Sequence, residues 1–253
     1  MKLSVVIPAH NEEGCLPQTL SGIVSRLETE RVPHEILVVN DNSSDGTETV
    51  LRRLCATCPT LSVIRNSGPP GYGFAVRAGL DAFTGDAAAI VMADGSDSPD
   101  DIVRYYRTIE KGYDCAFGSR FMKGAVVRGY PSHKLLLNRL ANLFIMALLG
   151  IRYNDVTNAF KCYRREVIDG IRPLLSNHFN LTVELPLKAI VRGYTYEVIP
   201  VSWTGREAGV SKLKIKEMGS RYLFIVLYVF LEKILARGDY RRDKAGGRGS
   251  PGR

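Results

Sequence analysis

The segment LSVVIPAHNEE, residues 3–13, decides the fold class of this chain. Its first five residues, 3–7, form a short and almost wholly apolar strand, as strands covered on both faces of a sheet do, and polar residues follow at once. The same order returns at residues 35–47, where EILVV precedes NDNSSDGT. Two buried strands that each end in a polar patch predict an α/β fold with a ligand site at the carboxyl ends of parallel strands.

Strands and helices alternate through the first half of the chain. Further strands are predicted at 61–64, 88–92 and 114–117, with helices near 12–28, 46–57, 73–84 and 99–111. In the second half, helices are predicted at 134–149, 164–176, 180–192 and 214–236, and strands at 159–163 and 195–202. We therefore expect a Rossmann-like, mostly parallel sheet that is flanked by helices and joined by right-handed crossovers.

Composition limits the class of protein but does not name it. The chain has 253 residues, 45% hydrophobic and 24% charged, which suits one large folded domain with a short tail. Its formal net charge of +8 favours anionic partners such as nucleotides, acidic lipid headgroups or nucleic acid. Five cysteines at irregular spacing argue against a disulfide scaffold and favour a reducing compartment.

Three polar patches follow predicted strands. The first two, 8–13 and 40–47, should converge at one edge of the sheet and together suit a pocket for a base and ribose, although each alone could simply cap the next helix. The third, ADGSDSPDD at 93–101, carries carboxylates that suit a divalent cation bound to phosphate oxygens. Such a cation neutralises charge on a leaving diphosphate. A helix N-cap followed by first-turn acids explains Asp100 and Asp101 well but Asp94 less well.

These motifs recur with others in a fixed order. The series is VVIPAHNEE, VVNDNSSDGT, the glycine-rich segment 68–79, VMADGSDSP, GSRF at 118–121, NRLAN at 138–142, NDVTNAFK at 154–161 and EVIP at 197–200. Over about residues 3–215 the chain resembles family 2 glycosyltransferases with the GT-A fold. More narrowly, it is similar to the polyprenyl-phosphate branch typified by dolichol-phosphate mannose synthase.

The resemblance implies roles for individual residues at the donor side. Asp94 would bind Mg2+ or Mn2+, with Asp97 as a second ligand, because Met92 stands where the family has the first acid of its D-x-D motif. The family's usual acid before Asp41 is Asn40 here, and its usual glycine before the phenylalanine of the 154–161 motif is Ala159. Five residues would contact the nucleoside: Pro8, Ala9, Asn11, Glu12 and Asp41.

The resemblance also implies the remaining catalytic residues. Arg120 and Asp155 would face the sugar and the phosphates, beside Asp94. The residues that would close on the diphosphate and on the acceptor phosphate are Arg206, Ser211 and Lys212. Arg139 is a further candidate for the acceptor phosphate, on the ground of its charge and not of the resemblance.

Reaction chemistry bears on the acceptor independently. A saccharide hydroxyl would need a general base, whereas a lipid phosphate is already ionised at neutral pH and needs only positioning and charge screening by arginine and lysine. Glu184 then has either a substrate-positioning role or a place on a helix face. We expect an inverting transfer of a hexose, mannose ahead of glucose, from GDP-mannose or UDP-glucose to a polyprenyl phosphate. A saccharide hydroxyl as acceptor, and a non-catalytic nucleotide-sugar binding protein, remain as alternatives.

Two apolar helices favour a membrane surface. The helix at 134–149 is apolar on nearly every face. In the helix predicted at 214–236, near the C-terminus of the chain, basic and aromatic residues flank an apolar run. We expect a GT-A domain at 1–213, an amphipathic interfacial helix at 214–237 and a disordered basic tail at 238–253. Neither run reaches the ~20 residues of a membrane span. The expected location is peripheral, at the cytoplasmic face of a membrane, which leaves room for a membrane-spanning partner.

Other nucleotide-binding classes fit less well. A nicotinamide enzyme would have G-x-G-x-x-G directly after the first strand, where this chain has PAHNEE, and no P-loop motif occurs. Nucleic-acid binding would rest on charge alone, so we expect no nucleic-acid partner.

Overall fold

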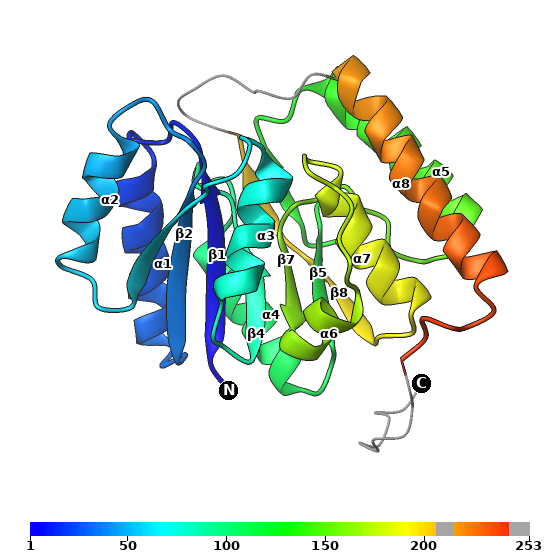
Figure 1. Cartoon of the computed structure of the whole chain (residues 1–253), viewed down its shortest axis with the longest axis horizontal. Helices are drawn as coiled ribbons and strands as arrows, with labels where there is room; N and C mark the ends of the chain where they lie inside the picture. The colour runs from blue at the N-terminus through cyan, green and yellow to red at the C-terminus, as the bar shows by residue number, and fades with distance from the viewer. Residues whose placement is uncertain (206–214, 243–253) are drawn as a thin grey trace.

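The computed structural model describes residues 1–205 and 215–242 of the chain. Arg206, Ser211 and Lys212, with their predicted roles, lie outside the described residues, as does residue range 243–253 of the predicted tail. Figure 1 shows a central sheet between two layers of helices, with two further helices along one side.

The central sheet has the strand order β3-β2-β1-β4-β7-β5-β8 within the described residues. Its strands are β1 (Leu3–Ala9), β2 (His34–Asn40), β3 (Leu61–Arg65), β4 (Ala87–Ile90), β5 (Cys115–Ser119), β7 (Lys161–Arg164) and β8 (Tyr196–Pro200). The predicted, mostly parallel sheet is confirmed, and β7 is the exception because it runs antiparallel to both β4 and β5. The chain leaves β5 at the carboxyl edge and returns to that edge before β7, so β7 must run the other way.

Helices cover both faces of the sheet. On one face lie α1 (Leu16–Thr29), α2 (Thr47–Cys55) and α4 (Pro99–Glu110), and on the other α3 (Tyr72–Ala82), α6 (Arg165–Gly170) and α7 (Leu181–Val191). Side chains of β1 alternate between the two cores, with Val5 in the first and Val6 in the second. This alternation explains why every residue of β1 is buried and apolar or small.

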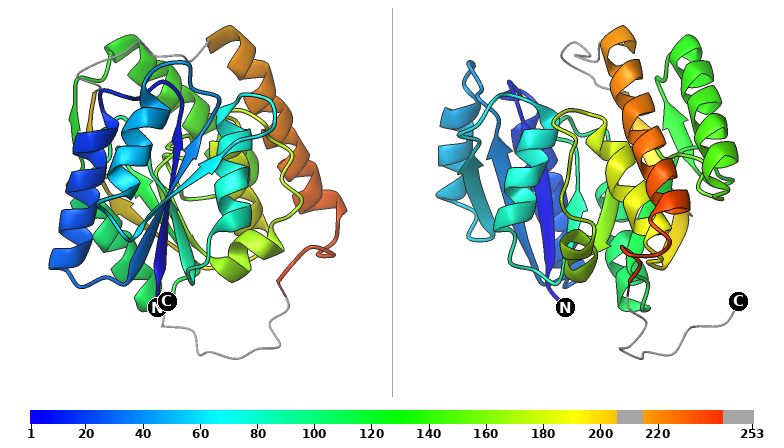
Figure 2. Two further views of the ribbon diagram at one scale, coloured as in Figure 1. Left: turned by 60° about the vertical axis from the view of Figure 1, so that its left-hand side comes forward. Right: turned by 45° about the vertical axis from the view of Figure 1, so that its right-hand side comes forward.

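The last two long helices lie outside these layers. Helices α5 (Ser132–Leu149) and α8 (Ile215–Leu235) run side by side, and α8 packs chiefly on α7 (Figures 1 and 2). A second, two-stranded parallel sheet joins β6 (Val126–Arg128) to β9 (Ser202–Thr204). The sequence analysis did not predict this small sheet.

Three predicted boundaries were wrong. Helix α1 begins at Leu16 and not near residue 12, and the Glu13 carboxylate instead accepts the backbone N–H of Gly46 before α2 at 2.7 Å. Helix α6 ends at Gly170, after which Pro173 prevents continuation. The strand predicted at 195–202 is two strands in different sheets, because β8 ends at Pro200 beside β5 and Ser202 already pairs with Val126 in the small sheet.

Two tyrosines of the second core differ by one hydrogen bond. Tyr153 and Tyr163 are fully buried, with ring centroids 5.0 and 5.6 Å from that of Phe117. The Tyr153 hydroxyl donates to the carbonyl oxygen of Gly118 at 2.9 Å, whereas nothing among the described residues pairs with the Tyr163 hydroxyl.

This difference predicts opposite effects of the same substitution. Tyr153→Phe should lower the free energy of unfolding by about 1 kcal/mol, because it removes the hydroxyl's hydrogen bond to the Gly118 carbonyl and leaves that oxygen only the longer bond from the Asn158 amide at 3.2 Å. Tyr163→Phe should leave that free energy unchanged or raise it, because it removes a hydroxyl that is buried without a partner. Urea denaturation of the two variants measures both effects. A larger loss for Tyr163→Phe than for Tyr153→Phe would contradict the assignment.

Candidate active site

Asp41 lies directly after β2 and is only 5% exposed. Its carboxylate accepts hydrogen bonds from the Asn66 side-chain amide at 2.7 Å and from the Gly71 backbone N–H at 2.8 Å. Its own N–H donates to the carbonyl of Ala9, which follows Pro8 in β1. The structure therefore brings together the ends of β1 and β2, as the sequence predicted, and adds the loop that follows β3.

Asn11 and Glu12 tie the first polar patch to the second. Asn11 has a φ of 55°, which asparagine tolerates better than most residues. Its side-chain oxygen accepts the Ser44 N–H at 2.8 Å, and the Glu12 N–H donates to the Thr47 hydroxyl at 2.9 Å. These bonds shape the rim of the predicted nucleotide pocket, and direct nucleoside contacts by Asn11 and Glu12 stay predictions.

Asn40 departs from the family pattern for a structural reason. Its side-chain amide donates to the Glu48 carboxylate at 2.6 Å, and its side-chain oxygen accepts the Ser43 N–H at 3.2 Å. The hydrogen bond from Asn40 lowers the pKa of Glu48. An aspartate at this position would bring two carboxylates together, so an amide suits this position better than an acid. The acid of the pocket is Asp41.

Asn66 is a pocket residue that the sequence analysis missed. Besides Asp41, its amide donates to the Pro69 carbonyl at 3.0 Å, and its oxygen accepts the Gly68 N–H at 3.0 Å. It therefore fixes both the aspartate and the loop that leads to Gly71. The sequence offered one signal for Asn66: it comes just after a predicted strand, as Asp41 does.

Two glycines of the glycine-rich segment allow its backbone to pack closely against that of Asn177. A Cβ atom added at Gly73 would lie 2.4 Å from the backbone carbonyl carbon of Asn177. A Cβ atom added at Gly71 would lie 2.8 Å from the backbone carbonyl oxygen of the same residue. Between the two glycines, Tyr72 stacks on Phe179 with ring centroids 4.3 Å apart. The start of α3 is thus pressed against the chain that precedes α7.

The acidic loop after β4 holds both predicted metal ligands. The Asp94 carboxylate accepts the Ser96 N–H at 3.1 Å, and the Asp97 carboxylate accepts the Met92 N–H at 3.0 Å. Burial raises the pKa of Asp97 to about 7, against the Met92 hydrogen bond and with help from the charge of Asp94. A cation beside Asp97 would offset the cost of burying its charge.

The donor set fits Mg2+ or Mn2+ only together with a substrate. Within residues 1–205 and 215–242, no three side chains of His, Cys, Asp or Glu cluster so that they could hold a metal ion. Mg2+ is commonly held by one or two carboxylates, with water and substrate phosphates as its other ligands. Asp94 and Asp97 can supply such a pair, and their metal binding stays a prediction.

Arg120 and Asp155 form a buried bidentate ion pair. The Arg120 Nε and Nη2 atoms donate to the two Asp155 oxygens at 2.9 and 2.8 Å, and the Arg120 backbone N–H adds a third bond of 2.9 Å. The side chain of Asp155 is fully buried and that of Arg120 is 8% exposed. Burial opposes the charge of Arg120, but Asp155 outweighs burial and raises the pKa of the guanidinium. Asp155 therefore orients Arg120.

The guanidinium groups of Arg139 and Arg120 both lie near the aromatic ring of Phe121. The two guanidinium carbons lie 5.0 and 5.6 Å from the centroid of Phe121, and Arg120 also lies 5.4 Å from the Tyr130 ring. Arg139 is exposed on α5. Two of the four cations predicted to bind phosphate are thus gathered at one aromatic group, and the other two, Arg206 and Lys212, lie outside the described residues.

The loop that carries Asp155 is anchored on both sides. On one side, the Asn142 amide of α5 donates to the Thr157 hydroxyl at 3.2 Å. On the other, the buried Lys161 ammonium donates to the carbonyls of Val156 at 3.0 Å and of Asn158. Burial lowers the pKa of Lys161 to about 7. The NRLAN and NDVTNAFK motifs are therefore one structural unit that holds the ion pair.

Comparison with known proteins gives the family. Residues 4–172 match the model for glycosyl transferase family 2. The chain belongs to this family. The resemblance noted in the sequence is thereby confirmed, and the chain is a glycosyltransferase.

Two relatives support this membership over most of the chain. Polyprenol monophosphomannose synthase of Mycolicibacterium smegmatis is 34% identical over 215 residues, which cover 83% of this chain and 80% of that protein. Dolichol-phosphate mannosyltransferase of Pyrococcus furiosus is 33% identical over 220 residues, which cover 85% of this chain and 60% of that protein.

Solved structures support the fold. Glucosyl-3-phosphoglycerate synthase from Mycobacterium tuberculosis with uridine diphosphate has a TM-score of 0.66 and 18% identity, covering 92% of this chain and 79% of that chain. The same enzyme with Mg2+ and uridine diphosphate has a TM-score of 0.65 at the same identity. Likeness at this identity establishes the GT-A fold and carries no substrate with it.

Proposed function

We propose that this glycosyltransferase moves a hexose, mannose ahead of glucose, from a nucleotide sugar to a polyprenyl phosphate at a membrane surface, with inversion at the sugar. The two relatives named above, one a polyprenol and one a dolichol-phosphate mannose enzyme, support the acceptor class. The observation that carries the proposal is the cation pair at Phe121. Arg120 and Arg139 flank this ring, and exposed Leu140 follows Arg139 on α5. An anionic group with a long apolar chain suits that combination.

The chemistry needs cations more than a base. An oxygen of the lipid phosphate forms the new bond to the anomeric carbon while the bond to the nucleoside diphosphate breaks, so negative charge moves to the leaving group. The attacking phosphate is already ionised, and no proton has to be removed. Arg120 and Arg139 would hold the acceptor by charge-assisted hydrogen bonds. A divalent cation held by Asp94 would neutralise charge on the diphosphate.

Exposed apolar side chains support membrane association. We call them the apolar helix face, and it consists of Leu136, Leu137, Leu140, Leu143 and Phe144 of α5 and Leu223, Phe224, Leu227, Leu231, Ile234 and Leu235 of α8. Exposed apolar surfaces of this kind mark interaction sites, and Figure 2 shows the two helices side by side. No helix in the described parts of the chain is long and apolar enough to cross a bilayer. We propose peripheral binding at the cytoplasmic face, with room for a membrane-spanning partner.

Transfer of radiolabelled sugar to a polyprenyl phosphate in detergent tests the reaction. GDP-mannose and UDP-glucose are compared as donors, with Mg2+, Mn2+ or EDTA. We expect metal-dependent label in the lipid phase, which Asp94→Ala should lower by about a hundredfold or more, because the leaving charge loses its stabilising cation.

Asp100→Ala is the matched control, since this carboxylate belongs to the same acidic segment but is 68% exposed and pairs with Arg26. Equal activity of the Asp94 and Asp100 variants would contradict the metal role of Asp94. Intact nucleotide binding without any lipid label would instead favour a saccharide acceptor or a non-catalytic binding protein.

A further inference from the structure

A buried ion pair on α7 has no part in the chemistry proposed above. The side chains of Glu184 and Lys188 are both fully buried, with 2.7 Å between the Lys188 Nζ and Glu184 Oε1 atoms. Replacing such a pair by apolar side chains of similar size is often neutral or stabilising. Stability alone therefore does not account for the pair, and its other contacts have to be considered.

Glu184 binds the backbone of the segment before its own helix. Its Oε1 atom accepts the Leu175 N–H at 2.8 Å and its Oε2 atom accepts the Ser176 N–H at 2.7 Å. Lys188 adds a bond of 2.5 Å to the carbonyl of Pro173. Residues 171–180 contain no helix or strand that would hold them through a regular ladder. The carboxylate and the ammonium thus hold residues 173–176 in the middle of this stretch, which we call the 171–180 segment, and Arg192 binds the carbonyl of Arg172 near its start.

The next residues of the 171–180 segment support the start of α3. The backbone of Asn177 lies so close to Gly73 that a Cβ there would come within 2.4 Å of it. The Asn177 side chain accepts a hydrogen bond from Arg77 at 2.9 Å, and the Phe179 ring stacks on Tyr72. The segment is therefore the wall against which the first turn of α3 rests.

The first turn of α3 in turn reaches the nucleotide pocket. The backbone N–H of Gly71, directly before Tyr72, binds the Asp41 carboxylate at 2.8 Å. A continuous set of contacts thus leads from Lys188 through Glu184 and the 171–180 segment to Gly71 and Asp41. Each contact in it is a hydrogen bond, an ion pair or tight backbone packing.

We propose that Glu184 is a positioning residue for nucleotide-sugar binding, which acts by holding the 171–180 segment against Gly71 and Tyr72. The inference rests on the proposed nucleotide pocket at Asp41. Glu184 does not touch the nucleotide. Lys188 pairs with one oxygen of the Glu184 carboxylate, and each of the two oxygens accepts one backbone N–H group.

Glu184→Gln tests the role, because it preserves shape but turns one acceptor into an NH2 group that faces a backbone donor. The dissociation constant of GDP and of UDP, measured by titration calorimetry, should rise about tenfold for whichever nucleotide the wild type binds. The KM for the nucleotide sugar should rise with it, while kcat at saturating donor changes by less than about threefold, as expected for lost binding alone.

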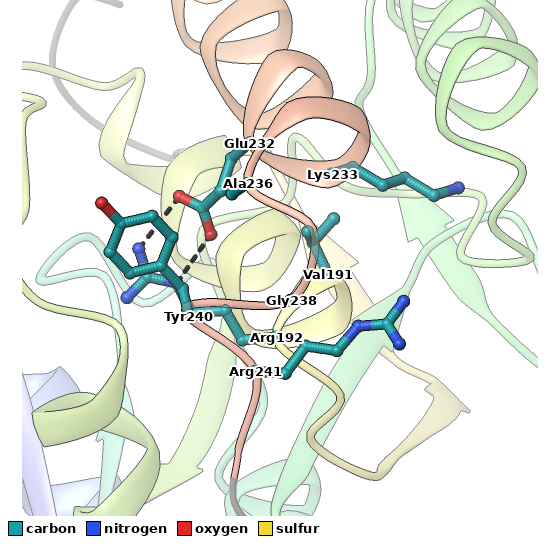
Figure 3. A pocket seen from close by; sticks show the side chains of 8 residues that line it. All are labelled: Val191, Arg192, Glu232, Lys233, Ala236, Gly238, Tyr240 and Arg241. Carbon is teal, nitrogen blue, oxygen red and sulfur yellow. Dashed lines mark hydrogen bonds and ion pairs between the residues drawn. The ribbon is translucent and has the colours of Figure 1, made fainter.

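The ion pair at the other end of α7 provides a matched control. Arg192 binds Glu232 of α8 through two bonds of 2.8 and 3.0 Å, and both side chains are at least nine-tenths buried (Figure 3). Arg192 also donates to the Arg172 carbonyl at 3.1 Å, but Glu232→Gln leaves that bond in place and alters none of the bonds from Glu184. This variant should therefore lower the melting temperature as Glu184→Gln does but leave nucleotide affinity nearly unchanged. Equal changes in affinity for the two variants, or none for a folded Glu184→Gln protein, would overturn the inference.

Two further variants keep the test decisive. If Glu184→Gln does not fold, Arg77→Ala cuts the link between Asn177 and α3 without leaving a buried charge unpaired, and should raise the same dissociation constants about threefold. No change in Arg77→Ala would then count against the inference. Asp41→Asn tests the pocket itself. If Asp41→Asn binds nucleotide as the wild type does, the proposed pocket is refuted. If Asp41→Asn loses nucleotide binding but Glu184→Gln keeps wild-type affinity, only the positioning role of Glu184 is refuted.

Discussion

Asp155→Asn should abolish sugar transfer and lower the free energy of unfolding by about 3–5 kcal/mol, because it leaves the buried Arg120 guanidinium without its counter-charge. The asparagine keeps the size of the side chain but places an NH2 group against the Arg120 donors. Arg120 would then turn away from Phe121, and the acceptor phosphate would lose its oriented cation. Urea denaturation and the lipid-transfer assay measure the two effects separately.

Two companion variants separate catalysis from folding. Arg120→Lys keeps a positive charge but cannot form the two-pronged bond to Asp155, so transfer should fall even where the protein folds. The double variant Asp155→Asn with Arg120→Met removes both charges, and should recover most of the stability while remaining inactive. Substantial transfer by the double variant would show that the pair serves the fold and not the reaction.

The central part of the fold was predictable because it is locally encoded. Apolar runs such as 3–7 and 35–39 followed by polar patches specify buried parallel strands, and adjacent strands bring Ala9 and Asp41 together without further information. The direction of β7 was not predictable in this way. Residues 159–163 indicate a strand by composition, but its antiparallel pairing follows from a connection that leaves β5 and returns to β7 at the same edge of the sheet, which is a tertiary fact.

Residues that act through loops were harder to predict. Asn66 binds Asp41 from 25 positions away, and Glu184 binds backbone groups eight and nine positions before it, in segments without periodicity. Such bonds leave no repeating pattern in a sequence. In the sequence, Asn40 stood out only because the family has an acid at this position. The structure explains the amide, because β2 and α2 place the Glu48 carboxylate beside it.

Adding two charges to the apolar helix face should detach the protein from lipid without harming its nucleotide pocket. Leu143 of α5 and Leu231 of α8 are 58% and 49% exposed, so aspartate at both positions should cost the fold little. If each leucine enters the interface, losing both should weaken binding to vesicles by about a hundredfold or more, since burying a leucine contributes about 1.5–3 kcal/mol. Co-sedimentation with phosphatidylcholine vesicles that contain phosphatidylglycerol measures the effect.

Charge alone must be excluded as the cause, because the protein is basic and the vesicles are acidic. Ser21→Asp with Ser25→Asp adds the same two charges at exposed positions of α1, on the opposite side of the sheet from α8. This control should bind vesicles nearly as well as the wild type, and both double variants should bind nucleotide normally. If the two double variants lose vesicle binding equally, the attraction is electrostatic and the apolar helix face is not the docking surface. If only the leucine variant is released, and its transfer to a short-chain acceptor in solution persists, the face delivers the enzyme to its lipid and takes no part in the chemistry.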